Sequence, residues 1–410
     1  MERDALSYTC DRLTPELCDL HLTNGTMLVR GLHLRYWIFD LPRPALTPIN
    51  QSSTSFRRPA LTPSLLPIIM VHGGPGWSHH YMLPLKQQAC RGRKVIFYDQ
   101  VGAGLSEKPA SAANTTAPWL LTIPYYVTEL QTVADNLLGS NQNFHLLGSS
   151  WGTIVAQEYA LQMPPPAQLA SLTLSGPLSD GQLYIRSQWD ATEGNLGTLP
   201  PFTQERIRKL ERTPGGFDSL EYKLLNEHLE ASFTVRTYPA PDCFKTAAAL
   251  MNSEIYVAMQ GPSEFTISGV LGRWSVTSQL HRVATPTLLT HGMYDTMRPP
   301  VLRVLQRALQ HAKVVLMPHS GHCSMIDDPK LMNDEVAAFL TCVESGASAA
   351  TCTEGGEMMS ALQVAETSAA RAFNGSMLEP VVPLSLMVAA IAVAMLGRLL
   401  RQAVQLGSLL

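Results

Sequence analysis

The sequence lacks several features that would assign it to a class at once. Its seven cysteines form no C-x-x-C pair, and their scattered spacing does not resemble the framework of a small disulfide-rich scaffold. This usage favours reduced thiols and a cytosolic setting. Neither charge dominates, because 30 lysines and arginines face 33 acidic residues. The formal net charge of −3 gives no reason to expect a nucleic-acid partner.

An apolar leader is also missing at the start of the chain. Residues 1–4 read Met-Glu-Arg-Asp, so we expect no secretory signal or transit peptide, and we expect a cytoplasmic protein. Four N-x-S/T sequons begin at Asn24, Asn50, Asn114 and Asn374. In a cytosolic protein such sequons have no role, and the sequence favours that interpretation.

What the chain has in quantity is apolar sequence arranged as alternating strands and helices. With 410 residues, 45% of them hydrophobic, it is long enough for one large core with an inserted subdomain. Short apolar runs predict strands at residues 31–39, 67–71, 94–98, 144–147, 169–174, 286–290 and 312–317. Helices are predicted at residues 125–138, 153–160, 301–312 and 331–342. This alternation predicts the α/β class, with a mainly parallel sheet and helices on both of its faces.

Changes in composition divide the chain into segments. Residues 177–282 contain few β-branched runs and several helical stretches, and we interpret them as a helical cap inserted into the sheet domain. Residues 42–67, rich in Pro, Ser and Thr, are interpreted as a surface insertion. The predicted segments are a core at 1–176 and 283–342, the cap at 177–282, a linker at 343–380 and an apolar tail at 381–410.

The G-S-S-W-G sequence at residues 148–152 is the first candidate for catalysis. It follows a predicted strand and precedes a predicted helix. In that context a G-x-S-x-G pattern is typical of a sharp turn that presents its central serine, Ser150, as a nucleophile. Two glycines suit such a turn because bulkier residues would collide with the strand or the helix.

A serine hydroxyl needs a base, and the base needs an acid that orients it. In folds that use this turn, the acid and then the histidine follow the serine along the chain, each at the carboxyl end of a strand. Asp295 follows the predicted strand at 286–290, and His322 follows the strand at 312–317, so both fit as the remaining members of a triad.

Other residues compete for these two roles. Asp180 lies beyond the strand at 169–174, where some hydrolases place their acid. His291 and His319 lie near the loops of the candidate acid and base, so each stays open as an alternative base.

Acyl transfer also requires donors for the oxyanion. The backbone N–H of Trp151, directly after the nucleophile, is one expected donor. The second is expected from Gly74, in the H-G-G-P-G run at residues 72–76, where glycines let the backbone approach a substrate closely. The constellation implies no metal and no cofactor.

Three motifs together resemble one known family. The H-G-G-P-G run at 72–76, the D-Q-V-G-A-G-L-S run at 99–106 and the G-S-S-W-G turn at 148–152 are similar to motifs of the proline iminopeptidases. The cap sequence M-Q-G-P-S-E-F at 259–265, followed by Gly269 and Trp274, extends the resemblance. In all it covers about residues 28–342.

The resemblance implies an α/β-hydrolase fold and a serine aminopeptidase that acts on short peptides or amino-acid amides with a free amino terminus. It assigns the triad to Ser150, Asp295 and His322, and it assigns Glu264 to the substrate's α-amino group. One position departs from the pattern, because members of the family often carry a second acid where this chain has Thr296.

Two alternatives to an aminopeptidase stay open. The chain could be an amidase or esterase on small acyl substrates, or a catalytically inactive, membrane-tethered binding protein of hydrolase fold. Proline preference and oligomeric state are not determined by the sequence.

The C-terminal tail is a candidate membrane anchor. Residues 381–396 are apolar except for Pro383 and Ser385, and Arg398 and Arg401 follow. This run is somewhat shorter than the roughly 20 residues that span a bilayer. We expect a tail anchor that leaves the catalytic domain in the cytosol, with a helix packed on the enzyme or lying flat on a membrane as alternatives.

Overall fold

The computed structural model of the chain describes residue 10 and residues 18–42, 65–109 and 118–354. Most of the predicted insertion at 42–67 and the whole apolar tail at 381–410 lie outside these residues, as do the sequons at Asn50, Asn114 and Asn374. Within the described residues, no helix is both long enough and apolar enough to cross a membrane.

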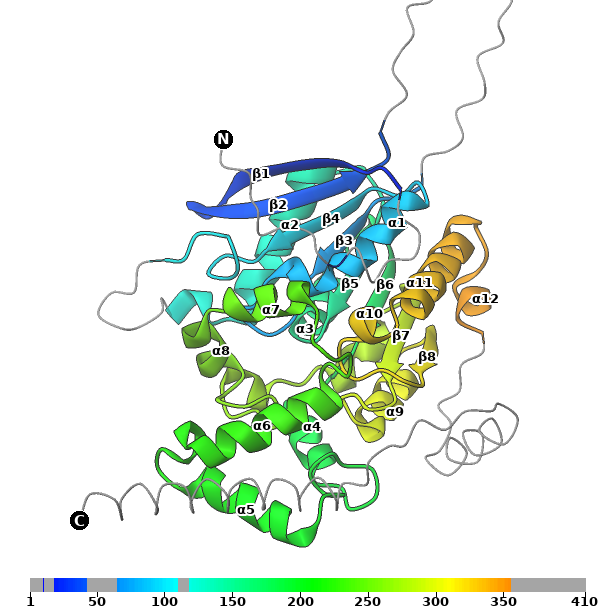
Figure 1. Ribbon diagram of the computed structural model, residues 1–410. Coiled ribbons are helices and arrows are strands. Elements are labelled where there is room, and N and C mark those ends of the chain that lie inside the picture. The colour runs from blue at the N-terminus through cyan, green and yellow to red at the C-terminus, as the bar shows by residue number, and fades with distance from the viewer. Residues whose placement is uncertain (1–9, 11–17, 43–64, 110–117, 355–410) are drawn as a thin grey trace, which may run out of the picture. The chain divides into compact units, whose positions relative to one another are not determined.

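An eight-stranded sheet forms the centre of the molecule (Figure 1). Its strand order is β1-β2-β4-β3-β5-β6-β7-β8. The strands are β1 (His21–Val29), β2 (Leu32–Asp40), β3 (Ile68–Val71), β4 (Val95–Asp99), β5 (Phe144–Ser149), β6 (Leu169–Ser175), β7 (Thr287–Gly292) and β8 (Ala312–Met317). The strands from β4 to β8 run parallel, and β1 and β2 are antiparallel. The predicted α/β class is therefore confirmed.

Helices cover both faces of the sheet, and β3 shows how the sequence divides between them. Ile69 packs in the cluster that contains the buried faces of α2 (Ile123–Leu138), α3 (Trp151–Ala160) and α9 (Pro299–Ala308). Its neighbours Ile68 and Met70 pack in a second cluster, which contains the buried face of α11 (Pro329–Glu344). Successive strand residues point to opposite faces, so a continuous apolar run is needed where both faces are covered.

The hairpin of β1 and β2 lies at one edge of the sheet. Its two-residue turn consists of Arg30 (φ 50°) and Gly31 (φ 85°), the positive-φ pair typical of a type I′ turn. The sequence predicted β2 but not β1, because the residues of β1 alternate irregularly between polar and apolar.

The segment between β6 and β7 is helical. It contains α4 (Gly181–Gln188), α5 (Pro201–Arg212), α6 (Leu220–Phe233), α7 (Asp242–Ala249) and α8 (Ser253–Met259). Part of it has a small core of its own, which includes Ile207, Tyr222 and Phe265. Asn252 attaches it to the sheet domain, because its backbone N–H donates to Gly76 O (2.8 Å) and its side chain donates to Gly102 O (2.8 Å).

Six of the seven cysteines form disulfides, so the expectation of reduced thiols is wrong for them. The pairs are Cys10–Cys243, Cys18–Cys90 and Cys342–Cys352, with Cα–Cα separations of 5.6, 5.7 and 5.6 Å. Cys323 is free and buried. Two of these pairs join residues 233 and 72 positions apart, so their spacing in the sequence gave no sign of the pairing.

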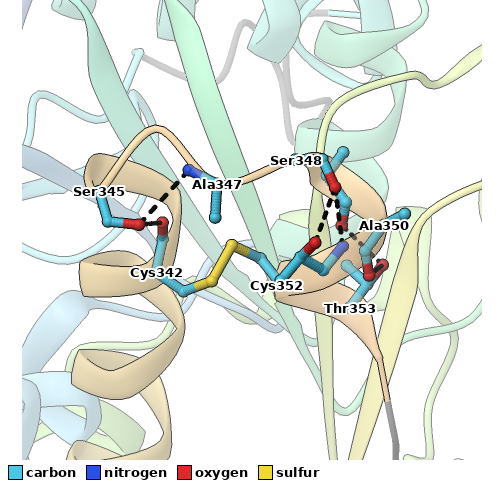
Figure 2. The surroundings of a disulfide bond; sticks show 9 residues. Cys342, Ser345, Ala347, Ser348, Ala350, Cys352 and Thr353 are labelled. Atoms are coloured by element: carbon cyan, nitrogen blue, oxygen red, sulfur yellow. Dashed lines mark hydrogen bonds between the residues drawn. A yellow bond between two sulfur atoms is a disulfide. The ribbon is translucent and has the colours of Figure 1, made fainter.

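The third disulfide changes where the predicted linker begins. Cys342 in α11 is bonded to Cys352 in the short helix α12 (Ala349–Thr353), and Ser348 caps that helix through Thr351 N (3.1 Å) (Figure 2). Residues expected to start a linker at 343 are instead fastened to the sheet domain as far as this helix.

Candidate active site

The G-S-S-W-G sequence forms a tight turn between β5 and α3. Ser150 has φ 55°, and Arg30 is the only other non-glycine with a positive φ in the described part of the chain. A side chain at Gly152 would place its Cβ 2.1 Å from Val71 O, so only glycine lets α3 begin this close to β3. The strained serine is therefore held by the strand and the helix on either side.

Asp295 and His322 meet in the structure as the sequence predicted. His322 Nδ1 lies 2.6 Å from Asp295 Oδ1, and both side chains are buried. Met297 N donates to the same carboxylate oxygen at 2.8 Å, which fixes its orientation. Gly176, after β6, lies directly against the pair, because a Cβ there would approach His322 Cε1 to 2.6 Å.

The two charges of this pair stabilise one another. Burial disfavours protonation of His322, but the charge of Asp295, its hydrogen bond and the charge of Glu264 outweigh burial, so the pKa of His322 is raised above 6.5. Burial alone would raise the pKa of Asp295, yet His322 and the hydrogen bond lower it. Asp295 is therefore ionised and able to stabilise an imidazolium.

The competing residues lie in other surroundings. Asp180 caps α4 by accepting from Leu183 N at 2.6 Å. His291 is buried behind the acid, with its Nδ1 3.5 Å from Asp295 Oδ2, and burial lowers its pKa to about 4. His319 is exposed.

The H-G-G-P-G loop lies against the nucleophile. A Cβ on Gly73 would approach Ser150 Cβ to 2.6 Å, and Gly73 N donates to Tyr81 Oη at 2.6 Å. Gly74 has φ 41° and lines the same cavity as Ser150. Trp151 is the first residue of α3, and N–H groups at a helix start have no partner within the helix.

Gln100 connects the two segments that are expected to supply the oxyanion donors, a role that sequence reasoning missed. Its backbone N–H donates to His72 Nε2 (3.1 Å), and its side-chain amide donates to His72 O (3.0 Å). The amide oxygen accepts from Trp151 Nε1 at 2.8 Å. The glutamine of the D-Q-V-G-A-G-L-S motif thus fixes the indole and the H-G-G-P-G strand end in one position.

The cap contributes an acidic side chain, Glu264, to the site. Glu264 accepts a hydrogen bond from Tyr256 Oη at 2.9 Å. Burial raises its pKa, whereas the charge of His322 and the hydrogen bonds from Tyr256 and Thr296 lower it in part. Thr296 therefore lies beside Glu264.

Glu230 in α6 is a second acid that sequence reasoning missed. Burial, with a contribution from the charge of Glu264, raises the pKa of Glu230 to about 7. The end of the same helix contacts the catalytic loop, because Phe233 O and Thr234 O accept from the backbone N–H groups of His322 and Cys323, both at 2.9 Å. No local pattern distinguishes Glu230 from the other acids of α6.

One small cavity brings these parts together. Its lining includes Ser150, His322, Glu264 and Gly74, together with an aromatic wall of Trp77, Tyr81 and Phe244. The rings of Trp77 and Phe244 are 5.4 Å apart. Of the residues predicted for the site, Asp295 lies behind His322, and Trp151 is buried at the start of α3.

One group of side chains among the described residues has the composition of a metal site. His79, His80 and Asp99 are buried close together. Their atoms already have partners, because Asp99 accepts from His79 Nδ1 (2.9 Å) and Leu105 N (2.8 Å), and His80 Nδ1 lies 3.0 Å from Ser78 Oγ. The group therefore serves as a hydrogen-bonded support for the loop at 99–106.

Comparison with known proteins gives consistent matches. A family profile described as the alpha/beta hydrolase fold matches residues 67–329. The chain is 30% identical to the proline iminopeptidase of Flavobacterium johnsoniae over 299 residues, which cover 72% of this chain and 96% of that protein. It is 32% identical to the proline iminopeptidase of Heyndrickxia coagulans over 278 residues, covering 68% and 91%. The crystal structure of a Mycobacterium smegmatis proline iminopeptidase is similar with a TM-score of 0.68 and 26% identity, covering 80% of this chain and 100% of that one.

Proposed function

Because this chain belongs to the proline iminopeptidase family of α/β hydrolases, we propose that it is a serine aminopeptidase that releases the N-terminal residue from short peptides. One observation carries the proposal. Ser150 and His322 line the same small cavity as Glu264, so the candidate nucleophile and base face a carboxylate suited to an α-ammonium group.

In the proposed reaction Ser150 Oγ attacks the carbonyl carbon of the first residue while His322 Nε2 takes the hydroxyl proton. The N–H groups of Gly74 and Trp151 stabilise the oxyanion. His322 then gives its proton to the leaving amine as the C–N bond breaks, which leaves an acyl-enzyme on Ser150. Water, deprotonated by His322, hydrolyses that ester. Asp295 orients the imidazole throughout.

The acids of the cap explain why one residue at a time would be removed. A substrate whose α-ammonium pairs with Glu264 places its first carbonyl at Ser150, and a chain extended beyond the amine has no such anchor. Glu230 adds a second negative charge near Glu264. In this proposal it takes the place of the acid that Thr296 replaces.

The aromatic wall supports a preference for a compact apolar first residue. Trp77, Tyr81 and Phe244 present ring surfaces to the small cavity that they line. The apolar pyrrolidine ring of proline would pack on these aromatic faces. Proline is thus the first residue that we propose, with alanine as the nearest competitor.

A panel of naphthylamides tests this function. Prolyl-naphthylamide should be cleaved fastest, alanyl-naphthylamide more slowly, and N-acetylprolyl-naphthylamide barely at all. Equal cleavage of the free and acetylated substrates would favour the second candidate, an amidase or esterase, which the loss of the acid at Thr296 keeps open. A chain that neither cleaves any of them nor reacts with a fluorophosphonate would be the inactive binding protein.

We also propose that the tail attaches the enzyme to a membrane. Residues 381–396 support this by their apolar sequence. Washing isolated membranes with carbonate should leave the full chain attached and release a chain truncated after Glu354. Release of both would contradict the proposal. The expectation of a cytosolic protein depended in part on reduced thiols, and the three disulfides remove that part of its support.

A further inference from the structure

The three disulfides suggest where this protein matures. Structural disulfides form and persist in oxidising compartments and are rare in the reducing cytosol. Here they join the N-terminal segment to the cap and to α1 (Gln87–Cys90), and they fasten α12 to α11 (Figure 2). In such a compartment, an exposed N-x-S/T sequon is an acceptor for glycosylation.

The sequon at Asn24 is the one that the described residues contain. Asn24 and Thr26 are both exposed on β1, and they lie on the same face because strand residues alternate. Gly25 between them faces the other way and lies over the ring of Tyr36, since a Cβ there would come within 2.4 Å of Tyr36 Oη. Packing against Tyr36 thus accounts for the glycine in the middle of the sequon, but it does not account for the exposure of Asn24.

The strand that carries Asn24 is an edge that lacks the usual protection. Among the described strands, β1 pairs only with β2. Strand β1 is nine residues long. It contains no Lys, Arg, Asp, Glu or Pro, and Leu28 on the same face as Asn24 is 60% exposed. Exposed edges of this kind are prone to pair with other chains unless something blocks them.

We propose that Asn24 carries an N-linked glycan, added in the oxidising compartment where the disulfides form. The donor is an oligosaccharide linked to a lipid diphosphate. Asn24 Nδ2 forms a bond to C1 of the first sugar, the bond from C1 to the diphosphate oxygen breaks, and the Nδ2 proton leaves with the lipid diphosphate. The glycan covers the free edge of β1. This inference does not depend on the proposed function.

The test uses the full chain, tagged and expressed in its own host. Peptide mapping before and after treatment with a glycan-releasing amidase in ¹⁸O water should show a glycosylated Asn24 that becomes ¹⁸O-labelled Asp. Thr26→Ala should abolish the modification, and Thr26→Ser, which keeps the sequon, should retain it. Asn141→Gln, an exposed asparagine outside any sequon, is the matched control and should change nothing.

An unmodified Asn24 in the wild-type chain would overturn the proposal, as would modification that persists in Thr26→Ala. The proposal would also be overturned if the six paired cysteines reacted with an alkylating reagent before the disulfides were reduced. The peptides that contain the other sequons, at Asn50, Asn114 and Asn374, are analysed separately, and a glycan found only on one of these also counts against Asn24. Asn24→Gln should leave kcat unchanged, because β2, β4 and β3 separate β1 from the strand before Ser150. It should increase self-association in size-exclusion chromatography.

Discussion

The sheet domain and the cap contribute to the candidate site in different ways. In the sheet domain, Ser150, Asp295 and His322 each follow a parallel strand, and their positions are fixed by backbone geometry within a few residues. In the cap, Glu264 and Glu230 come from a loop and a helix whose positions depend on packing. The comparison teaches that the proposed bond-breaking groups are set by local features of the chain, whereas the proposed recognition groups are set by tertiary packing. Variants of the sheet domain should therefore affect all substrates equally, and variants of the cap should discriminate between them.

Loss of the nucleophile should have the largest effect. Ser150→Ala should lower kcat by roughly 10⁵- to 10⁶-fold on every substrate, because the rest of the triad cannot act without it. Thermal unfolding should be nearly unchanged, since a smaller side chain at this strained turn loses no hydrogen bond that the structure depends on. Active-site titration and burst kinetics provide the measurement. A variant that keeps normal turnover would show that Ser150 is not the nucleophile.

Asp295→Asn should lower kcat by about 10⁴-fold on all substrates, because the imidazole loses the carboxylate that orients it. The pH profile gives a second readout. In the wild type, kcat rises with pH as His322 loses its proton, at a pKa above 6.5. Without the charge of Asp295, burial outweighs the smaller influence of Glu264 and lowers the pKa of His322, so the rise should move to lower pH. A rise at unchanged pH would mean that another group sets it.

The first prediction for the cap is a loss of activity that is confined to substrates with a free amino group. Glu264→Gln should raise the barrier for prolyl-naphthylamide by about 2–5 kcal/mol, or from about 30-fold to several thousand-fold in kcat/KM. Cleavage of the N-acetylated substrate should change little. Glu205→Gln, on the exposed face of α5, is the matched control. Equal losses on both substrates would make Glu264 a structural residue and would erase the difference between the two regions.

Glu230 should have the smallest effect, and one that depends on pH. Its pKa of about 7 means that its carboxylate is charged above that pH and neutral below it. Glu230→Gln should therefore lower kcat/KM for free-amine substrates by about tenfold at pH 8 and by much less at pH 6. The ratio of variant to wild type across this range is the measurement. A ratio that does not change with pH would exclude a role for this charge.

Most of the fold was accessible from the sequence because buried parallel strands are short apolar runs. β3 to β8 and the helices α2, α3, α9 and α11 lie where the patterns predicted them, within a few residues. β1 was missed because an edge strand buries little of one face and alternates weakly. The interpretation of the cysteines was wrong for a related reason, since Cys10 and Cys243 become neighbours only when the cap packs on the sheet domain.

The sequence by itself indicated the candidate nucleophile turn, because the positive φ of Ser150 and the close approach of Gly148 to Gly152 involve residues only a few positions apart. It also determined the order of the triad, since each member follows a strand recognisable on its own. Only the tertiary structure decided that Glu230 lies near Glu264, that Gln100 holds Trp151, and which cysteines pair. Those relations join residues far apart in the sequence. Burial and charge act between them only after folding has removed the water and brought them together.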